Sequence, residues 1–251
     1  MASVSPSGQW VSISVAPQGS VAGTEMPAWW VCPERPRAAV LVFPEVFGLN
    51  AWVRSVAERL AQEGYAALAI STFSRTAPDL DVGYDESGLA AGREHRDLVR
   101  ADQLLLDVDA AIAWLQNTPA AGKPVGSVGF CFGGHLALLA ASHSQIAATC
   151  DFYGARVSSF KPGEPGAQSL SSVPQIPGRL WCFCGSEDPL MPTQEQEAIQ
   201  QALAAMPHAG HRYVQANGAG HGYMCEARND FHPEAAAAGW KSMLALFAET
   251  L

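Results

Sequence analysis

The sequence predicts an α/β fold in which helices cover both faces of a mostly parallel β-sheet. Apolar runs of strand length recur along the chain, and most are separated by segments with helical periodicity, which is typical of parallel sheets. Runs such as AAVLVF also lack polar alternation, as expected for strands buried on both faces. The chain has 251 residues, 48% of them hydrophobic, which is enough for a large core. We therefore predict a single domain over residues 1–251.

The expected strands follow from the apolar runs. Seven of them are WVSISVA, MPAWWVC, AAVLVFP, YAALAI, VGSVGF, AATCDFY and RLWCFC, and HRYVQ is the expected last strand. The first two runs precede any helix, so we expect them to pair antiparallel at one edge of the sheet.

The expected helices each show one apolar stripe at helical spacing. The stripes lie within residues 52–60, 104–115, 199–206 and 240–247, and a further helix rich in alanine and leucine follows VGSVGF. Residues 71–88 and 155–178 are expected to be irregular, because proline and glycine cluster in them. Loops beyond the C-terminal ends of strands are where such sheets bind ligands.

Composition and charge exclude several classes of partner. The formal net charge is −9 and no run is rich in lysine or arginine, so the basic surface needed to bind nucleic acid is missing. The N-terminal segment MASVSPSGQWVSISVAP lacks the features of a signal peptide, and no apolar stretch is long enough to span a bilayer. The six cysteines have scattered spacings, unlike a disulfide scaffold. We expect a cytoplasmic protein with free thiols, and the oligomeric state stays open.

A candidate nucleophile lies where a predicted strand runs into a helix. In Gly129-Phe130-Cys131-Phe132-Gly133, the cysteine occupies the position of the serine in the G-x-S-x-G nucleophile elbow. At the start of a helix, backbone N–H groups and the helix dipole favour a thiolate. The alternative is that Cys131 is a small apolar core residue, as most free cysteines are. The combination of strand, glycines and helix favours the nucleophile.

A nucleophile of this kind needs a histidine as its base and an acidic residue that orients the histidine. In this motif the acidic residue comes after the nucleophile in the chain, and the histidine comes after the acidic residue. His221 stands in the glycine-bracketed loop NGAGHGYM after the expected last strand, whereas His208, His211 and His232 lie near element ends. His135 falls on the helix itself, and we interpret it as structural. The acid should follow RLWCFC, where Asp188 precedes a proline in GSEDPLMP and Glu187 is the competitor. Asp188 could otherwise be an ordinary turn or cap residue.

These motifs resemble the dienelactone hydrolase family of the α/β-hydrolase fold. The resemblance spans most of the chain and rests on FPEVFGLN, GFCFGG, GSEDPL and GAGHGY. It implies that Cys131, Asp188 and His221 form a triad and that Glu45 contacts the thiol and helps it ionise when substrate binds. A glutamate in so apolar a stretch is costly to bury without a partner, and the alternative for Glu45 is a pair with a structural arginine. The N–H groups of Phe132 and Val46 would form the oxyanion hole.

The expected activity is hydrolysis of small esters or lactones through an acyl-thioester, as in carboxymethylenebutenolidase, with no metal or organic cofactor. An alternative is a relative without catalysis that binds ligands or responds to redox through Cys131. A metal site built from Cys131, His221 and Cys225 is weakly supported, because no ligand pair has a recurring spacing.

The sequence departs from the family where a substrate carboxylate would bind. The family has an arginine shortly after the histidine, but Cys225 stands where we align it, and Arg228 is expected to lie out of reach. A second family arginine corresponds to Arg93 or Arg96, and Tyr223 is a further candidate for substrate binding. We therefore expect neutral esters or lactones to be hydrolysed at least as well as an anionic dienelactone.

Overall fold

The computed structural model describes residues 7–251, and its centre is one mostly parallel sheet. Within these residues the strand order is β1-β2-β4-β3-β5-β6-β7-β8. β2 is antiparallel to both β1 and β4, and the other neighbours are parallel. All eight expected strands are confirmed, with bounds β1 Gln9–Val15, β2 Thr24–Val31, β3 Ala38–Phe43, β4 Tyr65–Ile70, β5 Val125–Phe130, β6 Ile146–Phe152, β7 Arg179–Gly185 and β8 Arg212–Ala216.

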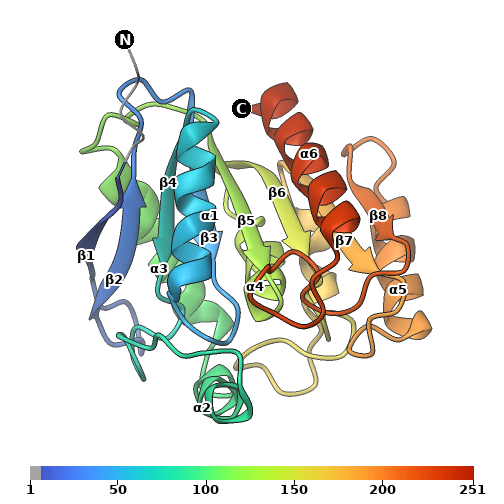
Figure 1. Ribbon diagram of the computed structural model, residues 1–251. Helices are drawn as coiled ribbons and strands as arrows, with labels where there is room; N and C mark the ends of the chain where they lie inside the picture. The colour runs from blue at the N-terminus through green and yellow to red at the C-terminus, as the bar shows by residue number, and fades with distance from the viewer. Residues whose placement is uncertain (1–6) are drawn as a thin grey trace.

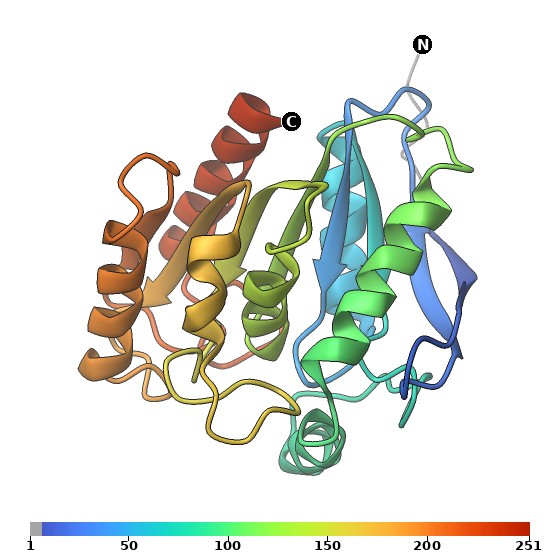
Figure 2. The ribbon, with the colours of Figure 1, turned by 180° about the vertical axis from the view of Figure 1, so that it is seen from behind.

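Helices cover both faces of the sheet, so the predicted fold class is confirmed. The helices are α1 Ala51–Gln62, α2 Glu86–Arg96, α3 Ala101–Leu115, α4 Phe132–Ala140, α5 Thr193–Ala204 and α6 Pro233–Thr250, with a 3₁₀ helix, η1, at Ser169–Gln175. α1 and α6 lie on one face (Figure 1), whereas α3, α4 and α5 lie on the other (Figure 2). In β3, Val40 packs into one core and Leu41 into the other. Alternate residues of β3 therefore serve opposite faces, and all six of its residues are buried.

The expectation of irregular chain is wrong at residues 86–88, which are the first turn of α2, and at η1, and the rest of α2 is a helix that the sequence patterns did not predict. α2 begins at Glu86 and lies beyond the ends of the parallel strands (Figure 1), and η1 falls within residues 155–178. Burial in α2 is confined to Gly88 and Gly92, so it presents no apolar stripe. Its start is stabilised by Asp85, whose side chain accepts a hydrogen bond from the Gly88 N–H at 2.7 Å.

The N-terminal segment is described in part. The N-terminal segment, in which we expect no signal peptide, begins with residues 1–6, and these lie outside the described residues. From residue 7 onward, no helix has the length and apolar character needed to cross a bilayer.

Asp151 is a buried carboxyl on β6 that makes stability depend on pH. It is 1% exposed, and Oδ1 accepts a hydrogen bond from the Gly154 N–H at 2.8 Å. Burial raises its pKa to about 7, although the Gly154 N–H and the Cys182 thiol oppose the rise. Because the folded pKa is above the unfolded one, the folded state is favoured most at acidic pH and loses stability as pH rises to the folded pKa.

We expect Asp151→Asn to remove this pH dependence. The amide oxygen can still accept from Gly154, but it never ionises, so the variant should gain about 4 kcal/mol over wild type between roughly pH 4 and pH 8. The measurement is the free energy of unfolding by urea at a series of pH values. Asp79→Asn, at an exposed position, is the control and should keep the wild-type slope. Parallel slopes for wild type and Asp151→Asn would contradict the prediction.

Candidate active site

Cys131 lies on the tight turn between β5 and α4. Its backbone has φ 54° and ψ −120°, in the region that favours glycine, and its N–H donates to the Phe152 carbonyl at 3.0 Å. The turn closes only because Gly129 lacks a side chain, since a Cβ there would collide with the Gly133 carbonyl. The thiol therefore projects beyond the C-terminal edge of the sheet, at the start of α4.

His221 and Asp188 meet at the same edge of the sheet. Asp188 follows β7 and His221 follows β8, and the His221 Nδ1 lies 2.8 Å from the Asp188 Oδ2. The other carboxylate oxygen of Asp188 accepts a hydrogen bond from the Leu190 N–H at 2.8 Å, which holds the carboxylate in place. Both residues are buried, at 5% and 4% exposure. The structure thus brings together the three predicted residues of the triad.

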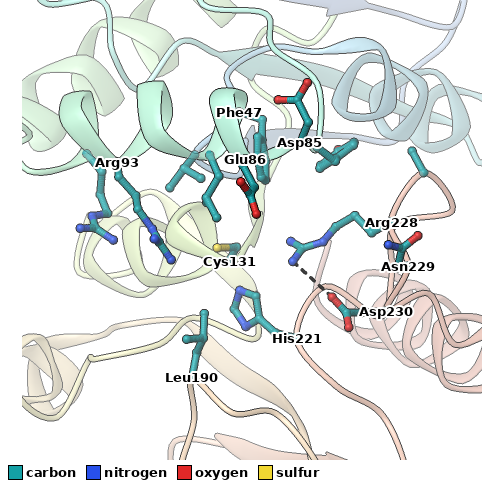
Figure 3. Close-up of a pocket in the computed structure, with 15 residues that line it drawn as sticks. Phe47, Asp85, Glu86, Arg93, Cys131, Leu190, His221, Arg228, Asn229 and Asp230 are labelled. Carbon is teal, nitrogen blue, oxygen red and sulfur yellow. Dashed lines mark ion pairs between the residues drawn. The ribbon is translucent and has the colours of Figure 1, made fainter.

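The imidazole of His221 faces the thiol of Cys131 (Figure 3). Because Nδ1 is engaged by Asp188, the remaining nitrogen is Nε2, which has no hydrogen-bond partner among residues 7–251. Burial lowers the pKa of His221, but the adjacent Cys131 thiolate and the Asp188 carboxylate outweigh it and raise the pKa to about 10. The arrangement therefore favours the protonated form of the His221 imidazole.

The competing residues lie elsewhere. Glu187 is exposed, and of the two neighbouring carboxylates it is Asp188 that contacts the imidazole. His211 accepts a hydrogen bond from the Leu180 N–H, and the His232 side chain caps α6. His135 is 1% exposed and hydrogen-bonded through both ring nitrogens, in keeping with a structural role.

Glu45 follows β3 and is fully buried beside the thiol-bearing turn. Its Oε1 accepts a hydrogen bond from the Arg228 Nη1 at 2.9 Å, whereas its Oε2 has no partner among the described residues. Burial raises the pKa of the Glu45 carboxyl, and the Arg228 guanidinium opposes that rise. The Glu45 carboxylate is thus paired with an arginine, and no hydrogen bond joins it to Cys131 in the part of the chain that the structure describes.

Two backbone N–H groups are free to bind an oxyanion. Those of Phe132 and Val46 donate to no backbone or side-chain acceptor within residues 7–251. Phe132 is the first residue of α4, where unpaired N–H groups and the helix dipole favour negative charge.

A cavity of about 290 Å³ opens above Cys131 and His221. Arg93, Arg96 and Arg228 all line it, together with Tyr84 and Leu190. The expectation that Arg228 lies out of reach is therefore wrong: the loop after His221 folds back so that Arg228 points toward Cys131 (Figure 3).

Tyr223 is buried rather than in the cavity. It is 1% exposed and packs edge-on against Tyr153, with ring centroids 5.2 Å apart, so this position does not support direct substrate contact.

Comparison with protein families settles the membership of this chain. The model of the dienelactone hydrolase family matches residues 26–251. The chain belongs to the dienelactone hydrolase family. It is accordingly a carboxylic ester hydrolase with the α/β-hydrolase fold.

Relatives of this dienelactone hydrolase family member agree with the assignment. A protein of Synechocystis sp. named "Putative carboxymethylenebutenolidase" is 39% identical over 84% of this chain and 86% of its own length. The carboxymethylenebutenolidase of Pseudomonas putida is 25% identical over 74% of this chain and 79% of its own. A Klebsiella pneumoniae structure described as a "Putative Dienelactone Hydrolase" superposes with a TM-score of 0.80 at 27% identity and covers 97% of this chain and 99% of its own.

Sequence reasoning missed two features of this dienelactone hydrolase site. An arginine partner for Glu45 was among the alternatives, but its identity was not predicted, because Arg228 is 183 positions away and the spacing of a single sequence carries no signal for such a contact. Tyr84, which lines the cavity and lies beside the Glu45 carboxyl, falls in residues 71–88, where irregular chain is expected. Its position in a loop beyond a strand end is the one signal that could have pointed to it.

Proposed function

We propose that this enzyme hydrolyses small esters or lactones by nucleophilic catalysis, with Cys131 as the nucleophile. The observation that carries the proposal is the line of contacts from Asp188 through His221 toward Cys131 at the mouth of the cavity. A nucleophile, a base in reach and an acid that orients the base are the parts that acyl transfer requires.

In the first half-reaction, the Cys131 Sγ attacks the ester carbonyl carbon. The carbonyl π electrons move to oxygen, and the oxyanion accepts hydrogen bonds from the N–H groups of Phe132 and Val46. As the tetrahedral intermediate collapses, the carbon–oxygen bond of the ester breaks and the His221 Nε2 donates its proton to the leaving oxygen. The products are an alcohol or enol and an acyl-thioester on Cys131.

In the second half-reaction, the neutral His221 takes a proton from water as the water attacks the thioester carbonyl. The carbon–sulfur bond breaks, which releases the carboxylic acid and restores the thiolate and the imidazolium. Asp188 keeps the ring in the required tautomer and stabilises its positive charge in both steps.

We assign Glu45 the role of a second proton acceptor for the thiol. In the resting arrangement its carboxylate is paired with Arg228. A substrate carboxylate that contacts Arg228 would compete for this guanidinium, and Glu45 would then become available to Cys131.

The free thiols of all six cysteines are compatible with a cytoplasmic enzyme.

We propose that the preferred substrates carry a carboxylate, which revises the expectation of neutral esters. Arg93 lines the cavity and forms no ion pair within residues 7–251, whereas Arg96 is paired with Asp97 and Arg228 with Glu45. Moving a substrate carboxylate from water into the cavity is favourable only if a cation such as the unpaired Arg93 guanidinium meets it. A guanidinium can bind a carboxylate through two hydrogen bonds.

Arg93→Ala should lower kcat/KM for an anionic dienelactone by about 10- to 100-fold, because one charged hydrogen-bond partner is lost. Hydrolysis of a neutral aryl acetate should change little. Raising the ionic strength should weaken only the reaction of the anion. The measurement is kcat/KM for both substrates at low and high salt.

Arg35→Ala is the matched control, because Arg35 is an exposed residue just before β3, at the opposite edge of the sheet. It should leave both substrates unaffected. If salt and Arg93→Ala alter neither reaction, the carboxylate subsite is wrong and the neutral ester becomes the better candidate substrate.

A further inference from the structure

The hollow above Cys131 continues on the side away from Arg228. This second space also measures about 290 Å³, and it shares Cys131 and His221 with the first. Its walls differ in character. We call it the apolar lobe, after the apolar walls formed by Phe132, Ala155, Phe160, Pro189 and Leu190. Arg93 and Arg96 line it as they line the first space, and Arg156 lines the lobe as well.

The wall of the apolar lobe is held in one shape. The His135 Nδ1 donates to the Ala155 carbonyl at 2.9 Å, and its Nε2 lies 2.6 Å from the Ser169 hydroxyl. The Ser169 N–H in turn donates to the Phe160 carbonyl at 3.2 Å. The two chain segments that flank the lobe are thus tied to α4 through one buried side chain, so the lobe exists before any ligand arrives.

His135, which holds the wall of the lobe, adds no charge to it near neutral pH. Burial lowers the pKa of His135 to about 4, so the imidazole is neutral near pH 7. The guanidinium of Arg156 lies over the Phe160 ring, 4.7 Å from its centroid, in a cation–π contact. An apolar group in the lobe would therefore meet the apolar walls, with a neutral imidazole behind them and guanidinium groups beside them.

Leu190 gives an independent indication of an apolar ligand. It follows Asp188 and Pro189, lines both spaces, and is 47% exposed although it is a large aliphatic side chain. Its backbone N–H is fixed by the Asp188 carboxylate, so the side chain cannot retreat into the core without disturbing the catalytic acid. A bound apolar group would cover this side chain.

We propose that the apolar lobe binds a ring-sized apolar arm of the substrate, while the carboxylate-bearing arm extends toward Arg228, which lines the first space. The two substituents of an ester carbonyl point apart, so a carbonyl at the Cys131 Sγ sends one arm into each space. A cavity of about 150 Å³ lined by apolar side chains is enough to hold benzene, so this lobe accommodates an aromatic ring. The inference rests on the proposed ester hydrolysis and narrows its substrate class.

The test uses two pairs of anionic esters that differ only by a ring. Monobenzyl and monomethyl succinate place the ring on the alcohol side, whereas phenylacetyl glycolate and acetyl glycolate place it on the acyl side. We expect kcat/KM to favour the ring-bearing ester by about tenfold or more in at least one pair, because it removes apolar surface from water. That pair then defines the orientation of the substrate.

Ala155→Phe should fill the lobe and reduce the ring preference to near unity, and Phe160→Ala should reduce it by removing one wall. Ser159→Phe adds the same ring at an exposed position of the same loop and should keep the wild-type preference. Thermal unfolding of each variant shows whether it is folded. If Ala155→Phe does not fold, Phe160→Ala and the binding experiment below decide the question.

Binding without turnover separates this inference from the proposed function. Benzyl alcohol should bind the Cys131→Ala protein, detected by saturation-transfer NMR, and should fail to bind when Ala155→Phe or Phe160→Ala is added. Binding without hydrolysis of any of the four esters would refute the proposed function and leave the lobe in place. Hydrolysis with no ring preference in either pair, and no binding of benzyl alcohol, would overturn the lobe and leave the proposed function in place.

Discussion

Cys131→Ala is expected to lower ester hydrolysis by at least about 10⁴-fold, which is the scale of loss when a catalytic nucleophile is removed. The fold should survive, because the side chain points out of the sheet into the cavity and its truncation leaves no gap in the core. The measurements are kcat/KM with an activated aryl ester and the Tm of the variant. Mass spectrometry should show one acyl group on the wild type and none on Cys131→Ala.

The matched control is Cys32→Ala, at a partly exposed cysteine whose thiol contacts the Pro33 carbonyl instead of the site. It should retain both turnover and the acyl adduct. Near-normal turnover in Cys131→Ala would rule out covalent catalysis by this thiol. Retained acylation in that variant would move the nucleophile to another residue.

His221→Ala should lower kcat by about 10³- to 10⁴-fold, because it removes the group that protonates the leaving oxygen and then activates water, whereas Glu45 is assigned only to accept the thiol proton. Asp188→Asn should be the milder change, because the amide still contacts the ring but no longer stabilises its positive charge. The measurement is single-turnover kinetics with an aryl ester, which separates acylation from deacylation. Both steps should slow, since His221 acts in each.

Glu187→Gln tests the choice of acid next to Asp188. Its side chain is exposed, so the variant should keep wild-type rates in both steps. Wild-type rates in Asp188→Asn combined with a loss in Glu187→Gln would transfer the role to Glu187. If His221→Ala is acylated at the normal rate, His221 takes no part in the acylation step.

The family and the fold were readable from local patterns. β3 is short and apolar throughout, as expected for a parallel strand that is covered on both faces and therefore shows no polar alternation. Cys131 was identifiable because a strand, two glycines and a helix within one short segment determine a turn that projects the middle residue. His221 and Asp188 followed from chain order, because each comes after a strand of the same parallel sheet.

Other features are decided by the packing of distant segments. α2 has no apolar stripe to reveal it, because it buries Gly92 against the Val46 backbone and Gly88 against the Gly83 backbone instead of side chains in the core. The reach of Arg228 depends on how the loop after β8 folds back over β3, which brings it to Glu45. A contact between segments this far apart lowers the cost of burying the Glu45 carboxylate, and it exists only once the whole sheet has formed.

The sequence by itself therefore determined the class of fold and the three residues of the candidate triad, because each depends on a local turn or on strand order. The tertiary structure alone decided the surroundings of that triad. The pairing of Arg228 and the apolar lobe anchored by His135 both arise where loops from separate strands meet. Loop conformation depends on contacts made after folding, and it is these contacts that shape the space for the substrate.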